Sequence, residues 1–210
     1  MQEESKSKGQ RNKSSVKQEN GTMHRNRTRL GVFGNLSRLC FAAILSAMSL
    51  VLGKFLQIPN PFQEFIRISF ENLPILLAGL SMGPVVGALV GVVADLIGCA
   101  LYGYSINPII TLGAALIGAI SGVISHYIVK KPLYARVIVS ATLAHTVGSV
   151  LVKSAGLAAW YLTKYQLGYF EFLAWRALNY AIVCTAECLI LCLLLRHRGF
   201  VKQMERMLGK

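Results

Sequence analysis

Long apolar segments alternate with short polar connections between residues 36 and 195. At about 1.5 Å per residue, about 20 apolar residues let a helix cross the hydrocarbon core of a bilayer. The pattern therefore predicts an all-α membrane protein that forms a bundle of six transmembrane helices. The predicted segments are Leu36–Leu56, Ser69–Ser81, Gly83–Tyr102, Pro108–Val129, Tyr134–Thr163 and Tyr169–Leu195.

Polar, basic stretches flank this predicted membrane domain of residues 36–195. Residues 1–35 are rich in Lys, Arg, Ser, Asn and Gln and lack hydrophobic periodicity, which predicts a disordered arm. Residues 196–210 form a second basic tail. We expect no signal peptide, because no short apolar stretch with a small-residue cleavage site follows the first residues.

The net positive charge alone would favour nucleic-acid binding, but the distribution of the basic residues along the chain argues against it. The formal net charge is +13, yet 54% of the residues are hydrophobic, which excludes most soluble classes. Seventeen of the 22 Lys and Arg residues lie in residues 1–38, in 129–136 and after 195. By the positive-inside rule, this places both termini in the cytoplasm. We therefore expect no nucleic-acid partner, and we expect the basic ends to attract anionic membrane lipid.

Asp95 is the one charged residue in the segment Gly83–Tyr102 and lies near its middle. A carboxylate at that depth costs about 2.5–3.5 kcal/mol on insertion scales, so it should face protein or a water-filled cavity. Two interpretations stay open: Asp95 belongs to a polar substrate site, or it is a structural acid bonded to a neighbouring helix.

Further polar residues gather toward the predicted outer side. With six crossings, Arg67, Lys153 and Arg176 lie in the outer half or in outer loops. The outer loop 102–108 combines aromatic rings with hydroxyl and amide groups, which suits a flat ligand with a polar edge. Interfacial charges and aromatic anchors are the alternative explanation for both features.

Motifs for catalysis are missing. The chain has no GxxxxGK[ST] loop, no HExxH and no GxSxG, so we expect no enzyme. The five cysteines form no CxxC pair, and His126 and His145 are isolated, so we expect no metal and no cofactor. Cys184, Cys188 and Cys192 recur every four residues and should pack on one helical face.

Three blocks of the sequence resemble the substrate-binding S components of energy-coupling factor transporters, and most of all the folate-specific members. The blocks are RISFENLPILLAG (67–79), GPVVGALVGVVADLIG (83–98) and YSINP (104–108), and the resemblance covers Leu36–Leu195. It implies a multi-pass protein of the bacterial plasma membrane that binds a vitamin outside with high affinity. It also implies docking on a transmembrane coupling protein driven by two ATPases, and delivery of the vitamin by toppling in the membrane.

The resemblance also implies roles for individual residues. Ala43 and Ala47 match the docking motif of the first helix, and Pro59, Asn60 and Pro61 occupy the gating loop. For folate, Asp95 or Asn107 could meet the aminopyrimidine edge, and Tyr104 or Phe70 could cover the pterin. The cation for the ligand carboxylates could be Arg67, Lys153 or Arg176.

Other ligands and other classes of protein are the alternatives. Riboflavin, pantothenate or thiamine would keep the fold, although a basic mouth favours an anionic vitamin over cationic thiamine. A stand-alone carrier or channel would transport without an ATPase. A small intramembrane enzyme would need a paired nucleophile and base, or a metal cluster, and the sequence offers neither.

Overall fold

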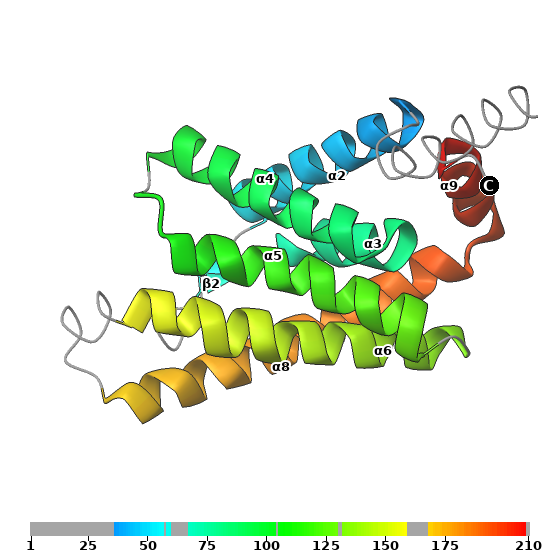
Figure 1. Cartoon of the computed structure of the whole chain (residues 1–210). Helices are drawn as coiled ribbons and strands as arrows, with labels where there is room; N and C mark the ends of the chain where they lie inside the picture. The colour runs from blue at the N-terminus through cyan, green and yellow to red at the C-terminus, as the bar shows by residue number, and fades with distance from the viewer. Residues whose placement is uncertain are drawn as a thin grey trace, which may run out of the picture.

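The computed structural model of the chain is a bundle of helices in which successive segments run in opposite directions (Figure 1). The structure describes residues 36–56, 58–59, 67–103, 105–129, 132–158 and 168–208. The helices are α2 (Leu36–Phe55), α3 (Asn72–Met82), α4 (Pro84–Tyr102), α5 (Pro108–Val123), α6 (Leu133–Ala144), α8 (Tyr169–Arg196) and α9 (Arg198–Leu208). The π-helical segments η1 (Ile124–Ile128) and η2 (His145–Lys153) continue α5 and α6.

Five helical segments of the described residues are long and apolar enough to cross a membrane. The remaining predicted segment, Ser69–Ser81, corresponds to α3, whose 11 residues extend over about 16 Å, which is shorter than a bilayer core. The predicted helical architecture is thus confirmed for the membrane-spanning part, and the count of six crossings stays a prediction. The five segments are Leu36–Phe55, Pro84–Tyr102, Pro108–Ile128, Leu133–Ala158 and Tyr169–Arg196.

Both ends of the described chain lie at one end of the bundle. The start of α2 and the whole of α9 are at the same end in Figure 1, and the two helices contact each other. This arrangement agrees with termini on one side of a membrane, and the cytoplasmic assignment of that side stays a prediction.

Short turns separate the helices where the sequence supplies the residues that a turn needs. Gly83 has φ 96°, a conformation that few other residues adopt, and Pro84 follows as the first residue of α4. At the next turn, the Asn107 side chain accepts a hydrogen bond from the Ile109 N–H and caps α5, whose first residue is Pro108.

Small residues let α4 and α5 pack with their backbones in contact. A Cβ atom at Gly87 would lie 2.6 Å from the Gly118 carbonyl oxygen, and one at Gly91 would lie 2.3 Å from the Ala114 carbonyl oxygen. Any larger side chain at either glycine would force the helices apart. The small-residue face of α4 therefore fixes the distance between α4 and α5.

Helix α3 forms the centre of the bundle although it is, with α9, one of the two shortest α-helices that the structure describes. Every residue from Asn72 to Ser81 is buried, and α3 contacts α2, α4, α5 and α6. A polar group at the start of α3 is therefore held inside the protein.

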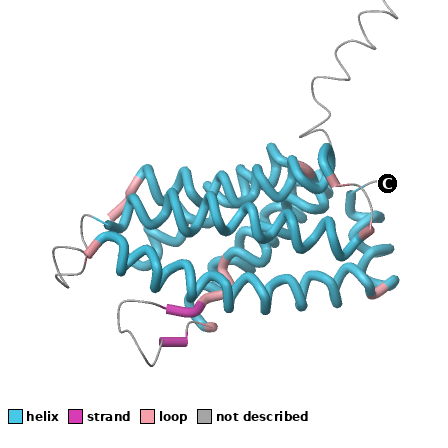
Figure 2. The backbone as a smooth tube through the Cα atoms, turned by 90° about the horizontal axis from the view of Figure 1, so that it is seen from below, coloured by secondary structure: helices cyan, strands magenta, loops and turns pink. Residues whose placement is uncertain are grey.

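A small hairpin leads from α2 into α3 and is visible beside the helices in Figure 2. Its strands are β1 (Ile58–Pro59) and β2 (Arg67–Ile68), paired antiparallel with Ile58 opposite Ile68. The predicted gating loop falls here, but Asn60 and Pro61 lie outside the described residues. After the hairpin, Ser69 and Phe70 lead to Glu71 and the start of α3.

Candidate functional site

A small polar cavity of about 120 Å³ lies where α2, α3, α4, α5 and η2 meet. Two acidic side chains and one basic side chain line it, contributed by three different parts of the chain: Glu71 before α3, Asp95 on α4 and Lys153 at the end of η2. Apart from Tyr102, the rest of the lining is small or apolar. It consists of Ser49, Leu50, Gly53, Ile75, Gly91, Ala94, Gly98, Cys99, Tyr102 and Ala114.

Lys153 is held in this cavity by two acceptors. Its Nζ donates to Glu71 Oε1 at 3.1 Å and to Asn72 Oδ1 at 3.3 Å. The Lys153 side chain is 7% exposed and that of Glu71 is 37% exposed. A buried ammonium group is tolerated only when it is paired and hydrogen-bonded, so the carboxylate and the amide together keep Lys153 charged inside the bundle.

Residues of two neighbouring helices make room for the ion pair of Lys153 and Glu71 and hold it in place. A Cβ atom at Gly113 would lie 2.6 Å from Lys153 Cγ, so the glycine on α5 leaves the space that the lysine stem occupies. The Ser49 hydroxyl on α2 donates to the Glu71 carbonyl oxygen at 2.6 Å, which fixes the turn before α3. Two neighbouring helices thus position the pair.

Asp95 combines the two roles that the sequence left open. Thr111 Oγ1 on α5 donates to Asp95 Oδ2 at 2.6 Å, so the carboxylate is bonded to a neighbouring helix. The same residue lines the cavity together with Lys153 and Glu71. Its second oxygen, Oδ1, is available to accept from a ligand if the Thr111 bond is kept.

Two other predicted site residues serve helix packing instead of lining the cavity. Asn107 caps α5, and its Nδ2 donates to the Gly156 carbonyl oxygen at 2.8 Å. Arg176 on α8 donates from Nε to Ser154 Oγ at 2.7 Å, and its guanidinium lies 5.6 Å from the centre of the Phe172 ring. Both side chains are therefore already engaged within the protein.

Of the remaining residues predicted to contact the ligand, none is placed in the cavity by the part of the chain that the structure describes. Phe70 is half-buried and is not part of the cavity lining. The backbone of Arg67 lies in β2, and its side chain is outside the described part of the structure. Tyr104 is outside the described residues altogether.

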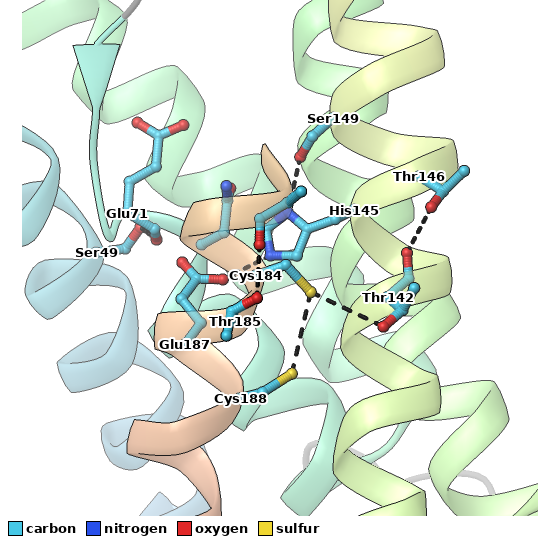
Figure 3. A network of polar contacts seen from close by, with 12 residues as sticks. Ser49, Glu71, Thr142, His145, Thr146, Ser149, Cys184, Thr185, Glu187 and Cys188 are labelled. Carbon is cyan, nitrogen blue, oxygen red and sulfur yellow. Dashed lines mark hydrogen bonds and ion pairs between the residues drawn. The ribbon is translucent and has the colours of Figure 1, made fainter. Parts of the chain in front are cut away.

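A second buried pair, His145 with Glu187, was missed by reasoning from the sequence (Figure 3). His145 Nε2 on η2 lies 2.5 Å from Glu187 Oε2 on α8, and His145 Nδ1 lies 3.2 Å from Ser149 Oγ. Glu187 is fully buried. The signal was present in the sequence, because His145, Ser149 and Lys153 recur every four residues in an apolar segment and so share one face.

Comparisons with known proteins agree on one family. The family model described as ECF transporter, substrate-specific component, matches residues 37–195. No curated protein matches the sequence. A crystal structure of FolT bound with folic acid is 25% identical with a TM-score of 0.59, over 75% of this chain and 91% of that chain. A structure of the S component of a bacterial ECF transporter is 25% identical with a TM-score of 0.58, over 77% and 95% of the two chains.

Proposed function

This chain belongs to the family of substrate-specific components of ECF transporters, and on that premise we propose that its own substrate is folate or a closely related pterin. Members of the family bind a vitamin and work with an energy-coupling module. The chain would give that module its specificity, bind folate on the outer side and deliver it inward by reorienting in the membrane. The solved structure of FolT with folic acid supports the choice of vitamin.

The observation that carries the proposal is the pairing of opposite charges in one cavity, with Asp95 and Glu71 beside Lys153. The aminopyrimidine edge of a pterin presents two N–H donors next to a carbonyl acceptor. A carboxylate and an ammonium group side by side complement that edge, and charge-assisted hydrogen bonds are the stronger kind. We assign Asp95 to the donors of the pterin and Lys153 to its carbonyl oxygen.

With the pterin in the cavity, the carboxylates of the folate tail would lie at the mouth of the site and need a basic partner there. Arg67, which lies in β2 at the base of the hairpin loop, is our candidate for binding them. The described cavity of about 120 Å³ is smaller than the roughly 300–1,000 Å³ of typical ligand pockets, so binding requires it to widen. The loop that joins β1 to β2 leads into β2, which lies just before Glu71 in the chain, and we assign the gate to that loop.

The surface of α2 supplies a candidate interface for the coupling protein and its two ATPases. Ala43 and Ala47 are exposed on this helix, and Ala43 lines a groove of about 290 Å³ between α2 and α4. Small exposed residues four apart let another transmembrane helix approach closely. This surface lies on the outside of the bundle, so docking would not block the cavity.

Calorimetric titration of the purified chain in detergent tests the substrate. Folate, riboflavin, pantothenate and thiamine would be compared on one preparation whose folding is verified by circular dichroism. We expect saturable binding of folate that is at least tenfold tighter than binding of the other three. Tight binding of another vitamin would overturn folate and keep the family. Uptake by vesicles that lack the ATPases would point to a stand-alone carrier.

A further inference from the structure

A long groove of about 730 Å³ runs along the outside of the bundle between α8 and the continuous helix α6–η2. Several of its lining residues are exposed, among them Ile138, Leu189 and Leu193, so the groove opens on the surface of the bundle. It is separate from the cavity that holds Lys153. Its further lining residues are Tyr134, Thr142, His145, Thr146, Val150, Ala177, Tyr180, Ala181, Cys184, Thr185, Cys188, Cys192 and Arg196.

Small side chains create the depth of this groove. Cys184, Cys188 and Cys192 lie on one face of α8 and all line the groove, which confirms that they share a face. Across from them, Thr142 and Thr146 line the groove from α6 and η2. Because these five side chains are small, they leave space between the two helices.

The hydroxyl groups of the three threonines that line the groove each have a contact within the protein. Thr146 Oγ1 donates to the Thr142 carbonyl oxygen at 2.8 Å, and Thr185 Oγ1 donates to the Ala181 carbonyl oxygen at 2.8 Å. The Thr142 hydroxyl lies 3.9 Å from Cys184 Sγ (Figure 3). The hydroxyl protons of Thr146 and Thr185 are therefore donated to carbonyl groups of their own helical segments.

His145 and Tyr180, which line the middle of the groove, also have partners within the protein. Both ring nitrogens of His145 have partners, Glu187 and Ser149. The Tyr180 hydroxyl accepts from Arg176 Nη2 at 3.4 Å. Because these polar groups are already engaged within the protein, this stretch of the groove favours a hydrocarbon chain over a polar ligand.

One end of the groove differs in chemistry from the rest. Arg196 and Tyr134 line it there, both are exposed, and neither bonds another side chain within the described part of the chain. From Arg196 to Cys184 the helix extends about 18 Å, close to the roughly 15 Å of one leaflet's hydrocarbon. An occupant with an anionic head and an apolar tail of one leaflet's length matches this charge and this distance.

We infer that the groove is a binding site for an anionic phospholipid, with its phosphate at Arg196 and an acyl chain along Cys192, Cys188 and Cys184. Tyr134 lies at the level of the headgroup, where aromatic side chains favour the membrane interface. The end that carries Arg196 is the end predicted to be cytoplasmic, where anionic lipids attract basic side chains.

Photo-crosslinking in lipid nanodiscs tests the inference on the full-length chain. Phosphatidylglycerol and phosphatidylcholine probes with the same diazirine-bearing acyl chain would be compared, and labelled residues mapped by mass spectrometry. We expect phosphatidylglycerol to label the groove at least fivefold more than phosphatidylcholine. Arg196→Gln should remove most of this preference, since one basic group near anionic lipid contributes about 1 kcal/mol, or about fivefold. The control Arg198→Gln removes an exposed arginine two residues away, outside the groove, and should keep the preference.

A second pair of variants tests the path of the acyl chain. Cys188→Phe fills the groove and should abolish labelling there, while Ile190→Phe places the same aromatic side chain on α8 outside the groove and should not. Circular dichroism checks that each variant is folded, independently of vitamin binding. Equal labelling by both probes, or labelling indifferent to Arg196→Gln and Cys188→Phe, would overturn the site. Labelling lost on assembly with the coupling protein would assign the groove to a partner helix and also overturn it.

Discussion

Lys153 Nζ lies 3.1 Å from Glu71 Oε1 and joins the end of η2 to the turn before α3. The two residues are 82 positions apart in the sequence, and the pair faces a cavity that Asp95 also lines. The partners are unequally buried, because the lysine side chain is 7% exposed and the glutamate side chain 37%. Because of this difference in burial, removing one partner should affect stability differently from removing the other.

Loss of the glutamate should destabilise the protein more than loss of the lysine. Glu71→Gln leaves an almost buried ammonium group without its counter-ion, and we expect a cost of about 1–3 kcal/mol in the free energy of unfolding. Lys153→Met leaves a carboxylate that still reaches water, so its cost should be smaller. Thermal unfolding followed by circular dichroism compares the two. A larger loss of stability for Lys153→Met than for Glu71→Gln would contradict this argument, because the buried ammonium group would then not depend on Glu71 as its counter-ion.

A comparison of Asp95 with Thr111 separates a ligand-binding acid from a structural one. Asp95→Asn removes the charged acceptor proposed for the pterin, and folate affinity should fall by about 10- to 100-fold, the equivalent of a charged hydrogen bond. Thr111→Val removes the 2.6 Å bond to Asp95 but keeps the carboxylate, so affinity should change little. Calorimetry measures both. Equal losses of affinity and stability in the two variants would make Asp95 a structural acid only.

The pair of His145 and Glu187 should contribute to stability in a strongly coupled way. His145→Phe leaves Glu187, which is fully buried, without its partner and should cost about 3–5 kcal/mol. Adding Glu187→Leu removes the stranded carboxylate and should restore a large part of that loss. Thermal unfolding of the single and double variants gives the coupling energy. Additive effects of the two substitutions would show that the 2.5 Å contact contributes nothing.

The sequence predicted the helices well because their signals are local. Apolar length locates the long spans, and Gly83 and Pro84 mark the turn between α3 and α4. The glycines of α4 predict close packing, which the Gly87 contact with Gly118 confirms. Length failed as a criterion only for α3, whose 11 residues are shorter than a membrane span.

The site was harder to predict because its contacts join distant parts of the chain. Lys153 could be named as a candidate, but its partner Glu71 depends on how α3 packs. His145 seemed isolated, because its partner Glu187 lies 42 residues away on another helix. Arg176 is a cation in the expected region, yet it bonds Ser154 and does not line the cavity. Side-chain type alone cannot distinguish a residue that packs helices from one that faces a cavity.

Larger side chains on the exposed face of α2 should impair docking on the coupling protein without changing vitamin binding. Ala43→Leu and Ala47→Leu add side chains where a helix of the coupling protein would approach, and such contacts depend on small residues. Both alanines are exposed and neither lines the cavity, so folate affinity of the isolated chain should stay unchanged. Co-purification with the coupling module and uptake into vesicles should both fall by at least tenfold, about 1.4 kcal/mol of binding free energy. Met48→Phe adds bulk on another exposed part of the same helix and should leave both intact. Unimpaired uptake by the alanine variants would place the docking surface elsewhere, whereas a matching loss of folate affinity would mean that this face of α2 supports the cavity.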